Sequence, residues 1–300
     1  MKRNTFIKTT AIASGLLFFS KYTSLANLLT KAGYEVKMLT ESIGIFTEKG
    51  GTILFYLDKK GIVVVDTQFP DTAQHLIEEI KKKSQKKYAY LINTHHHGDH
   101  TSGNIAFKNL VTTIVAHTNS VANQKAAAAK QKNEDKQLYA NTTFDTTWSK
   151  KLGKEVIELS YFGAAHTNGD IAVHFTKANV VHLGDLVFNR RYPYIDKNAG
   201  ASIVSWINVL QQIQAKYADN TTFVFGHAND GYTVTGTKAD IKAFENYLTQ
   251  LRNFVINEIQ LGKTKDEIIK AKAIPGNTEW RGDGIERGLT AACIELIDEV

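Results

Sequence analysis

Four of the ten histidines lie in one six-residue loop, residues 95–100 (HHHGDH). Imidazole and carboxylate are the usual nitrogen and oxygen ligands of zinc. Because alternate residues of an extended chain point to the same side, His95 and His97 can chelate one ion. Asp99 and His100 lie one step beyond a glycine bend and would then face a second ion. The loop therefore predicts ligands for two metal ions.

The loop alone is incomplete, because each ion needs further protein ligands and room for water. Three later residues follow predicted strands or small-residue turns, where sites assemble, and offer these ligands: His166, Asp185 and His227. Each is a weak signal by itself, since an aspartate after a strand is more often a turn or capping residue. An accidental histidine cluster or a surface metal-binding tract is the alternative for the loop. The order H-x-H-x-D-H after an apolar strand is nevertheless rare.

Strand and helix patterns surround these residues and must position them. Short apolar stretches bounded by turn residues predict strands at residues 35–39, 43–47, 52–57, 62–65, 88–92, 113–116, 156–161, 171–175, 180–183 and 222–225. One helical pattern begins at Pro70. Further helical patterns cover residues 119–140, 202–217, 238–261, 264–272 and 283–299. This order of strands and helices predicts sheets of mixed strand direction that are covered by helices. These patterns leave open an αββα sandwich and a doubly wound α/β sheet.

In chain order, the motif Val65-Asp66-Thr67, the loop 95–100, His166, Asp185 and His227 resemble the metallo-β-lactamase superfamily. The resemblance covers roughly residues 35–235. It implies an α/β fold, a four-layer αββα metallo-β-lactamase sandwich with a helical C-terminal extension, and two zinc ions per chain at one edge between the sheets. It also implies the ligand sets, which are His95, His97 and His166 on the first ion, Asp99, His100 and His227 on the second, and Asp185 bridging both.

Asp66 matches an aspartate that supports the metal ligands in this family. The residues alone leave open whether it tethers the metal loop or caps the following helix.

Two zinc ions would share a water molecule and lower its pKa toward neutrality, and the hydroxide would attack an electrophilic centre. Asp99 and Asp185 are the candidates for catalytic proton transfer. Many class B β-lactamases carry cysteine at the position of Asp185 and a lysine three residues later, where this chain has Phe188. We therefore expect hydrolysis of an ester, thioester, lactone or related acyl bond in a small-molecule substrate. A class B β-lactamase acting on β-lactam antibiotics is the alternative.

Composition limits the class of protein, the disulfide content and the partners that can be expected. The 300 residues are 43% hydrophobic and 22% charged, which is typical of a globular protein. The single cysteine, Cys293, excludes an intramolecular disulfide framework and is expected in the core. Residues 1–26 hold four basic and no acidic residues, so the rest of the chain has 32 basic against 30 acidic residues, a formal charge of +2. No nucleic-acid partner is expected at that charge. The oligomeric state stays open.

The first 26 residues have the pattern of a secretory signal peptide: a basic start, the apolar stretch Ala11–Phe19 and the small-x-small ending Ser24-Leu25-Ala26. The start resembles a twin-arginine signal, with Asn4 in place of the second arginine. General export, or an uncleaved N-terminal anchor, is the alternative. We expect a periplasmic or secreted protein without a stable membrane span after cleavage. The expected organisation is a signal peptide over 1–26, a hydrolase domain over 27–237 and a helical extension over 238–300.

Overall fold

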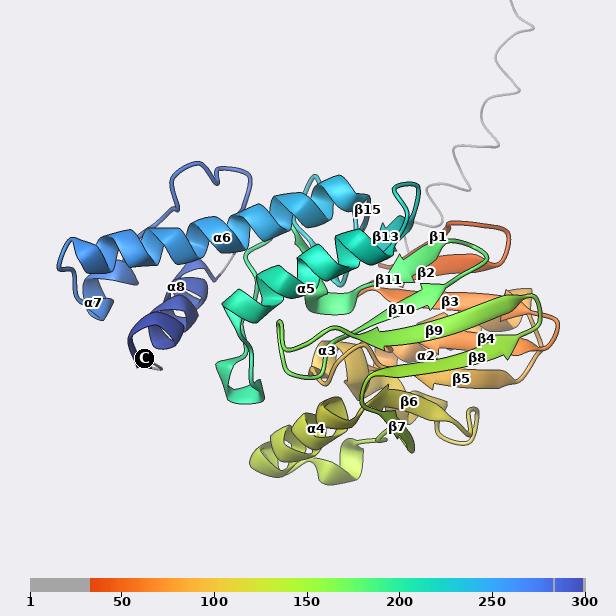
Figure 1. Ribbon diagram of the computed structural model, residues 1–300. Helices are drawn as coiled ribbons and strands as arrows, with labels where there is room; N and C mark the ends of the chain where they lie inside the picture. Colours follow the sequence, from red (N-terminus) through yellow and green to blue (C-terminus); the bar gives the residue numbers. More distant parts are fainter. Residues whose placement is uncertain (1–32, 283, 299–300) are drawn as a thin grey trace, which may run out of the picture. The chain divides into compact units, whose positions relative to one another are not determined.

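The computed structural model describes residues 33–282 and 284–298 (Figure 1). The expected signal peptide, residues 1–26, lies outside these described residues. Among the residues described, no helix has both the length and the apolar character needed to cross a membrane.

The first sheet has seven strands in sequential order, so each strand pairs with the next along the chain. They are β1 (Glu35–Met38), β2 (Ile43–Thr47), β3 (Ile53–Asp58), β4 (Gly61–Val65), β5 (Tyr88–Ile92), β6 (Ile114–His117) and β7 (Thr142–Phe144). β2, β3 and β4 are antiparallel neighbours, whereas β4 to β7 run parallel. The parallel strands direct their carboxyl ends to one edge of the sheet.

The second sheet has six strands: β8 (Thr147–Leu152), β9 (Glu155–Tyr161), β10 (Ile171–Phe175), β11 (Val180–His182), β13 (Thr222–Val224) and β15 (Thr235–Gly236). Their order is β15-β13-β11-β10-β9-β8, and the pair β11 and β13 is parallel. A separate pair, β12 (Phe188–Asn189) and β14 (His227–Ala228), is also parallel.

The two sheets pack face to face on alternate residues of their strands. Ile43 and Leu54 of the first sheet belong to one buried cluster with Leu159, Val173 and Phe175 of the second. Each fully buried aliphatic or aromatic side chain contributes roughly 1.5–3 kcal/mol relative to its exposed state. This core fixes the position of one sheet edge against the other.

Helices cover the outer faces of both sheets. α2 (Pro70–Lys83) begins with proline in its first turn, ends in three lysines that suit the helix dipole, and buries an apolar stripe that includes Leu76 and Ile80. α4 (Thr118–Gln131) packs beside β6 and β7. α5 (Ile203–Lys216) and α6 (Lys238–Gln260) run side by side over the second sheet (Figure 1). Helices on both sides of two packed sheets confirm the four-layer αββα architecture.

Helices follow the last strand of the second sheet, as expected. α6 begins at Lys238, the first residue of the expected extension, and Thr237 caps it by accepting a hydrogen bond from the Ala239 amide. α7 (Lys265–Ile268) is shorter than the pattern at 264–272 predicted, and α8 (Ile285–Cys293) ends in a π-helical turn, η5 (Ile294–Asp298). Cys293 is fully buried in the same hydrophobic cluster as Trp206 and Phe244, so its expected core position is correct.

The prediction of a helix over residues 119–140 is wrong for the second half of this range. α4 ends at Gln131 because Lys132 adopts a left-handed conformation with φ 55°, and only a short 3₁₀ turn, η2 (Glu134–Lys136), follows. β8 was not predicted. Its sequence TWSKKL is exposed along most of its length and lacks an apolar alternation. Pairing with β9 makes this segment a strand.

Candidate metal centre

The structure places all seven predicted ligands at the ends of strands, along one edge of the sandwich. They are His95 and His97 after β5, Asp99 and His100 in α3 (Gly98–Thr101), His166 after β9, Asp185 in η3 (Gly184–Leu186) after β11, and His227 in β14. Segments distant in sequence thus meet beyond the ends of strands from both sheets. The seven residues form two adjacent clusters.

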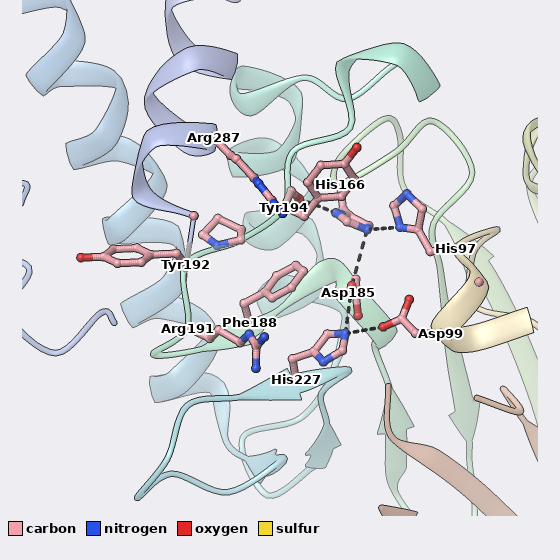
Figure 2. Close-up of a pocket in the computed structure, with 13 residues that line it drawn as sticks. His97, Asp99, His166, Asp185, Phe188, Arg191, Tyr192, Tyr194, His227 and Arg287 are labelled. Atoms are coloured by element: carbon pink, nitrogen blue, oxygen red, sulfur yellow. Dashed lines mark hydrogen bonds and ion pairs between the residues drawn. The ribbon is translucent and has the colours of Figure 1, made fainter. Parts of the chain in front are cut away.

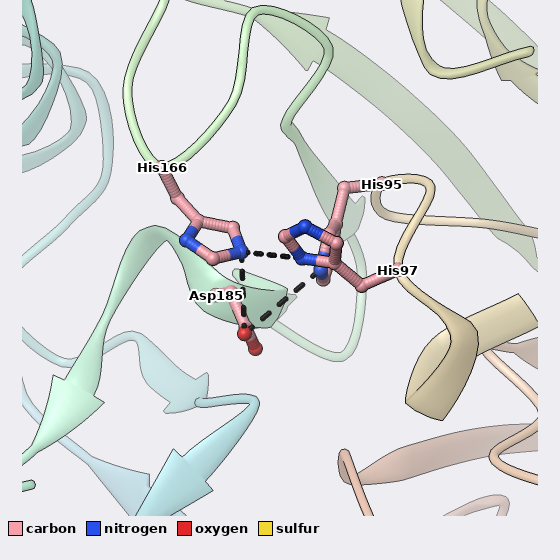
Figure 3. Close-up of side chains that lie close together, drawn as sticks. All are labelled: His95, His97, His166 and Asp185. Carbon is pink, nitrogen blue, oxygen red and sulfur yellow. Dashed lines mark hydrogen bonds and ion pairs between the residues drawn. The ribbon is translucent and has the colours of Figure 1, made fainter. Parts of the chain in front are cut away.

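The first cluster consists of His95, His97, His166 and Asp185, whose possible ligand atoms all lie within 4.8 Å of one another (Figure 3). His166 Nε2 lies 2.8 Å from His97 Nδ1 and 3.5 Å from Asp185 Oδ2. His95 Nε2 lies 3.9 Å from the same carboxylate oxygen. The three imidazoles are those that the family resemblance implied for the first ion.

The second cluster consists of Asp99, His100 and His227, again with possible ligand atoms within 4.8 Å. His227 Nε2 lies 3.1 Å from Asp99 Oδ2 (Figure 2). The Asp185 carboxylate also reaches this cluster, with Oδ1 3.1 Å from His100 Nε2 and Oδ2 3.4 Å from His227 Nε2. Asp185 therefore stands between the two clusters.

The spacing and the unsatisfied atoms of the two clusters fit metal ions. Ligand atoms about 2.1 Å from a tetrahedral zinc ion lie about 3.4 Å from each other, close to the separations within both clusters. Three of the converging atoms, His95 Nε2, His100 Nε2 and Asp185 Oδ1, are buried without a hydrogen-bond partner among the described residues. Although His100 Nε2 and Asp185 Oδ1 are 3.1 Å apart, their orientation is not that of a hydrogen bond. A bound cation would satisfy all three atoms.

The opposite ring nitrogens are held by fixed partners, which sets the imidazole tautomers. His166 Nδ1 lies 2.6 Å from the Tyr194 carbonyl oxygen, which can only accept a hydrogen bond. Nδ1 therefore carries the proton, and Nε2 keeps its lone pair towards the cluster. His97 Nε2 lies 2.9 Å from Asp196 Oδ2, which leaves Nδ1 to face the first cluster.

Asp66 tethers the metal loop and does not cap the next helix, because α2 begins after Phe69. The buried Asp66 carboxylate accepts hydrogen bonds from the Thr94 amide at 2.8 Å and the Thr94 hydroxyl at 2.7 Å. Its Oδ2 also lies 2.8 Å from His100 Nδ1. Thr94 Oγ1 in turn lies 3.1 Å from His95 Nδ1. Asp66 thus orients imidazoles of both clusters.

Replacing Asp66 with asparagine is expected to lower the affinity for zinc by about 10–100-fold, the usual effect of losing a carboxylate behind a histidine ligand. The substitution removes the charge that faces His100 Nδ1. The measurement is zinc retained after dialysis against graded chelator. The matched control is Asp58→Asn, whose carboxylate accepts hydrogen bonds from the Lys60 amide and the Tyr56 hydroxyl, outside the centre. Retention equal to that of the wild type would contradict this role.

Two glycines allow the clusters to close. A Cβ atom at Gly226 would collide with Asp185 Oδ1, and one at Gly51 would collide with the His100 ring. Both contacts involve buried side chains that have no room to move. These positions therefore require glycine for close approach of the backbone to the centre.

Burial is the largest influence on the pKa values of the centre. It lowers the pKa of His95 well below its usual range and that of His166 to about 3. Burial opposes ionisation of Asp185, but the neighbouring His227 and His100 outweigh it and hold the pKa of this carboxyl well below its usual range. Burial likewise opposes ionisation of Asp99, and His100 and His227 lower its pKa to about 2. Both carboxylates therefore favour the ionised form near neutral pH.

A cavity of about 340 Å³ opens onto the centre, a size suited to a small substrate (Figure 2). Both expected catalytic aspartates, Asp99 and Asp185, line it. Phe188 also lines it and stacks on the His227 ring, with centroids 5.4 Å apart and planes at 14°. Phe188 offers no charge, as the sequence indicates, but Arg191 and Arg287 line the same cavity. The pocket therefore has cations that could meet a substrate carboxylate.

Several residues of the site were not identified from the sequence. Asp196 holds His97, the Tyr194 carbonyl holds His166, and Arg191 and Arg287 line the cavity. Each is a single polar residue in a loop or on a helix surface, without a motif around it. His96, between two expected ligands, belongs to neither cluster and lies 3.8 Å from Asp196.

Two sheets packed between helices, with two clusters of imidazole and carboxylate groups at one edge, define a fold with a site for metal-dependent hydrolysis. The chain belongs to the metallo-beta-lactamase superfamily, a family of zinc-dependent hydrolases, whose family model matches residues 47–233. The resemblance seen in the sequence motifs is thereby confirmed.

Individual relatives are distant. The chain is 28% identical to "Metallo-beta-lactamase type 2" of Elizabethkingia meningoseptica over 182 residues. This alignment covers 60% of this chain and 70% of the relative. It is 25% identical to "Metallo-beta-lactamase type 2" of Bacillus sp. (strain 170) over 252 residues, an alignment that covers 77% of this chain and 95% of the relative. Among solved structures, "Metallo-beta-lactamase from Pontibacter korlensis" matches with a TM-score of 0.62 at 20% identity, covering 72% of this chain and 99% of that one. The DIM-1 metallo-beta-lactamase structure matches with a TM-score of 0.60 at 20% identity, covering 72% and 96%. These structural matches show the shared fold.

Proposed function

We propose that this chain is an exported dinuclear zinc hydrolase that cleaves an ester, thioester, lactone or related acyl bond. The observation that carries the proposal is the position of Asp185, whose carboxylate lies within 3.5 Å of His166 in the first cluster and of His100 and His227 in the second. A single carboxylate in that position can bind two ions and fix their separation.

The proposed ligand sets follow the two clusters. His95, His97 and His166 would hold the first ion, Asp99, His100 and His227 would hold the second, and Asp185 would contribute to both sites. Two zinc ions held there would supply a Lewis acid and a water molecule acidic enough to serve as nucleophile near neutral pH.

The aspartates of the cavity have separate tasks in this proposal. The Asp99 side chain is 30% exposed, so it can exchange a proton with the reacting groups and with solvent. The Asp185 side chain is only 5% exposed and is surrounded by imidazoles, so it acts mainly as a bridge. Phe188 stacks on His227 and gives that side of the cavity an apolar surface.

The acyl substrate class rests on the carboxylate at position 185, where many class B β-lactamases carry a cysteine. A β-lactam substrate is the second candidate. It is favoured by the name of the Bacillus relative, which is aligned over 95% of its length, and by Arg191 in the cavity, three residues after Phe188.

A substrate panel tests the proposal. We expect the zinc-loaded protein to hydrolyse at least one ester, thioester or lactone with a higher kcat/KM than any β-lactam. The panel contains one compound of each acyl class, a phosphodiester and a chromogenic cephalosporin, all assayed with the same preparation. A cephalosporin value above every acyl value would reverse the order of the two candidates.

Export is proposed from residues 1–26, and we expect a mature N-terminus near Asn27. The basic, apolar and small-residue segments of this stretch are what signal peptidase and the export machinery require. N-terminal sequencing of the protein from native cells provides the measurement. A mature chain that begins at Met1 or Lys2 would contradict export with cleavage.

A further inference from the structure

The cavity over the metal centre has a wall that the family model does not include. Gly284 and Arg287 line it and belong to the C-terminal segment, beyond the matched residues 47–233. Arg191 lines it from the loop after β12. Figure 2 shows both arginines on the side of the pocket away from His97 and Asp99.

The neighbouring Arg190 differs from these two arginines, because carboxylates neutralise its guanidinium group. Arg190 pairs with Asp240 at 3.3 Å and with Glu279 at 3.2 Å, and it lies over the rings of Tyr232 and Trp280. Arg191 and Arg287, by contrast, make no ion pair with a carboxylate among residues 33–282 and 284–298. Two guanidinium groups without a carboxylate partner in the described part of the chain therefore line one small cavity.

Both arginines are carried by well-fixed backbone. The Tyr192 amide donates to the Arg281 carbonyl at 3.1 Å, and the Arg281 amide donates to the Arg190 carbonyl at 3.2 Å, which ties the Arg191 segment to the C-terminal part of the chain. The same part of the chain is anchored by Glu295, which accepts hydrogen bonds from the Ile203 amide at 2.8 Å and the Val204 amide at 3.0 Å at the start of α5.

α8 itself is packed into the protein. Leu289, Ala292 and Cys293 are fully buried in the hydrophobic cluster of α5 and α6. Arg287 lies on the exposed face of this fixed helix, at the cavity. The C-terminal extension therefore presents a charged side chain to the substrate from a rigid element.

We infer that Arg287, together with Arg191, selects substrates that carry an anionic group, a carboxylate or a phosphate, next to the acyl bond that is cleaved. The inference rests on the proposed hydrolase function and adds its substrate class. Guanidinium groups bind both anions through paired charge-assisted hydrogen bonds. The C-terminal helix would thereby be part of the substrate site.

Matched thioesters test this inference with the zinc-loaded full chain. One substrate is a succinyl thioester, the second carries a terminal carboxamide in place of the carboxylate, and the third carries a terminal phosphate. We expect the wild type to prefer an anionic substrate over the carboxamide by about 10-fold or more in kcat/KM, the effect of one charge-assisted hydrogen bond. Arg287→Gln should reduce this preference about 10-fold, mainly through KM, and change the carboxamide rate less than about 3-fold.

Arg281→Gln is the matched control, because it removes an exposed charge of the same segment that does not line the cavity. It should keep the wild-type preference. If the preference that depends on Arg287 is larger for the phosphate thioester than for the succinyl thioester, the anionic group of the substrate is a phosphate. Equal preference ratios in the wild type and Arg287→Gln, or a wild-type preference for the carboxamide, would overturn the inference.

A binding measurement separates failure of this inference from failure of the proposed function. If the wild type cleaves no thioester, ester or lactone, the acyl hydrolase proposal fails. Calorimetric titration of the zinc-loaded protein with succinate then still tests the arginines. We expect Arg287→Gln to weaken succinate binding about 10-fold relative to Arg281→Gln, and equal dissociation constants would overturn the inference whatever the activity.

Discussion

Asp185→Cys is expected to lower kcat/KM for an ester, thioester or lactone by at least about 10²-fold, an effect typical of altered metal support and electrostatic stabilisation. The Asp185 carboxylate has one oxygen near His100 and the other near His166 and His227. A thiolate is a single softer donor, so it would serve one ion and lose the bridge between the clusters. The measurement is kcat/KM on the best acyl substrate at saturating zinc.

Asp219→Cys is the control for this substitution. Asp219 is almost fully exposed and pairs with Lys238 on the surface, so this substitution introduces the same thiol away from the centre. Activity of Asp185→Cys within a few-fold of this control would show that the carboxylate is not required as a bridge. The acyl substrate class would then lose its main support.

The double variant His95→Ala/His97→Ala is expected to bind about one zinc ion per chain where the wild type binds about two. It removes two of the three imidazoles of the first cluster, and the remaining His166 and Asp185 are too few for a closed site. Hydrolysis should fall by at least about 10³-fold, because electrostatic stabilisation at the reacting centre is lost. Metal analysis of the purified protein and the acyl assay together give the result.

A second double variant, His75→Ala/His174→Ala, controls for the loss of two imidazoles. His75 lies on α2 and His174 in β10, and neither belongs to the two clusters. This variant should retain about two zinc ions. Full zinc occupancy in His95→Ala/His97→Ala would instead mean that the first cluster is wrongly assigned.

Local patterns were sufficient to predict the framework of the site. The strands 43–47, 88–92 and 171–175 have the predicted bounds, because each is an apolar run between turn residues. The loop, the strand ends and the family resemblance together indicated seven residues, and all seven lie in the two clusters. β8 and the end of α4 were missed, since an exposed edge strand and a left-handed lysine leave no apolar pattern.

Local sequence patterns specify which chemical groups are available, namely imidazoles and carboxylates in the loop 95–100 and near strand ends, and they specify a helix that begins at Lys238. Which of these groups meet depends on how the sheets and helices pack. Asp66 was ambiguous until its carboxylate was seen 2.8 Å from His100, and the His97 contact with Asp196 joins residues 99 positions apart. The charged wall formed by Arg191 and Arg287 likewise exists only because α8 packs against α6, at the C-terminal end of the described chain. Such contacts depend on how sheets and helices pack, and the residues that make them have no distinguishing pattern in their own neighbourhood.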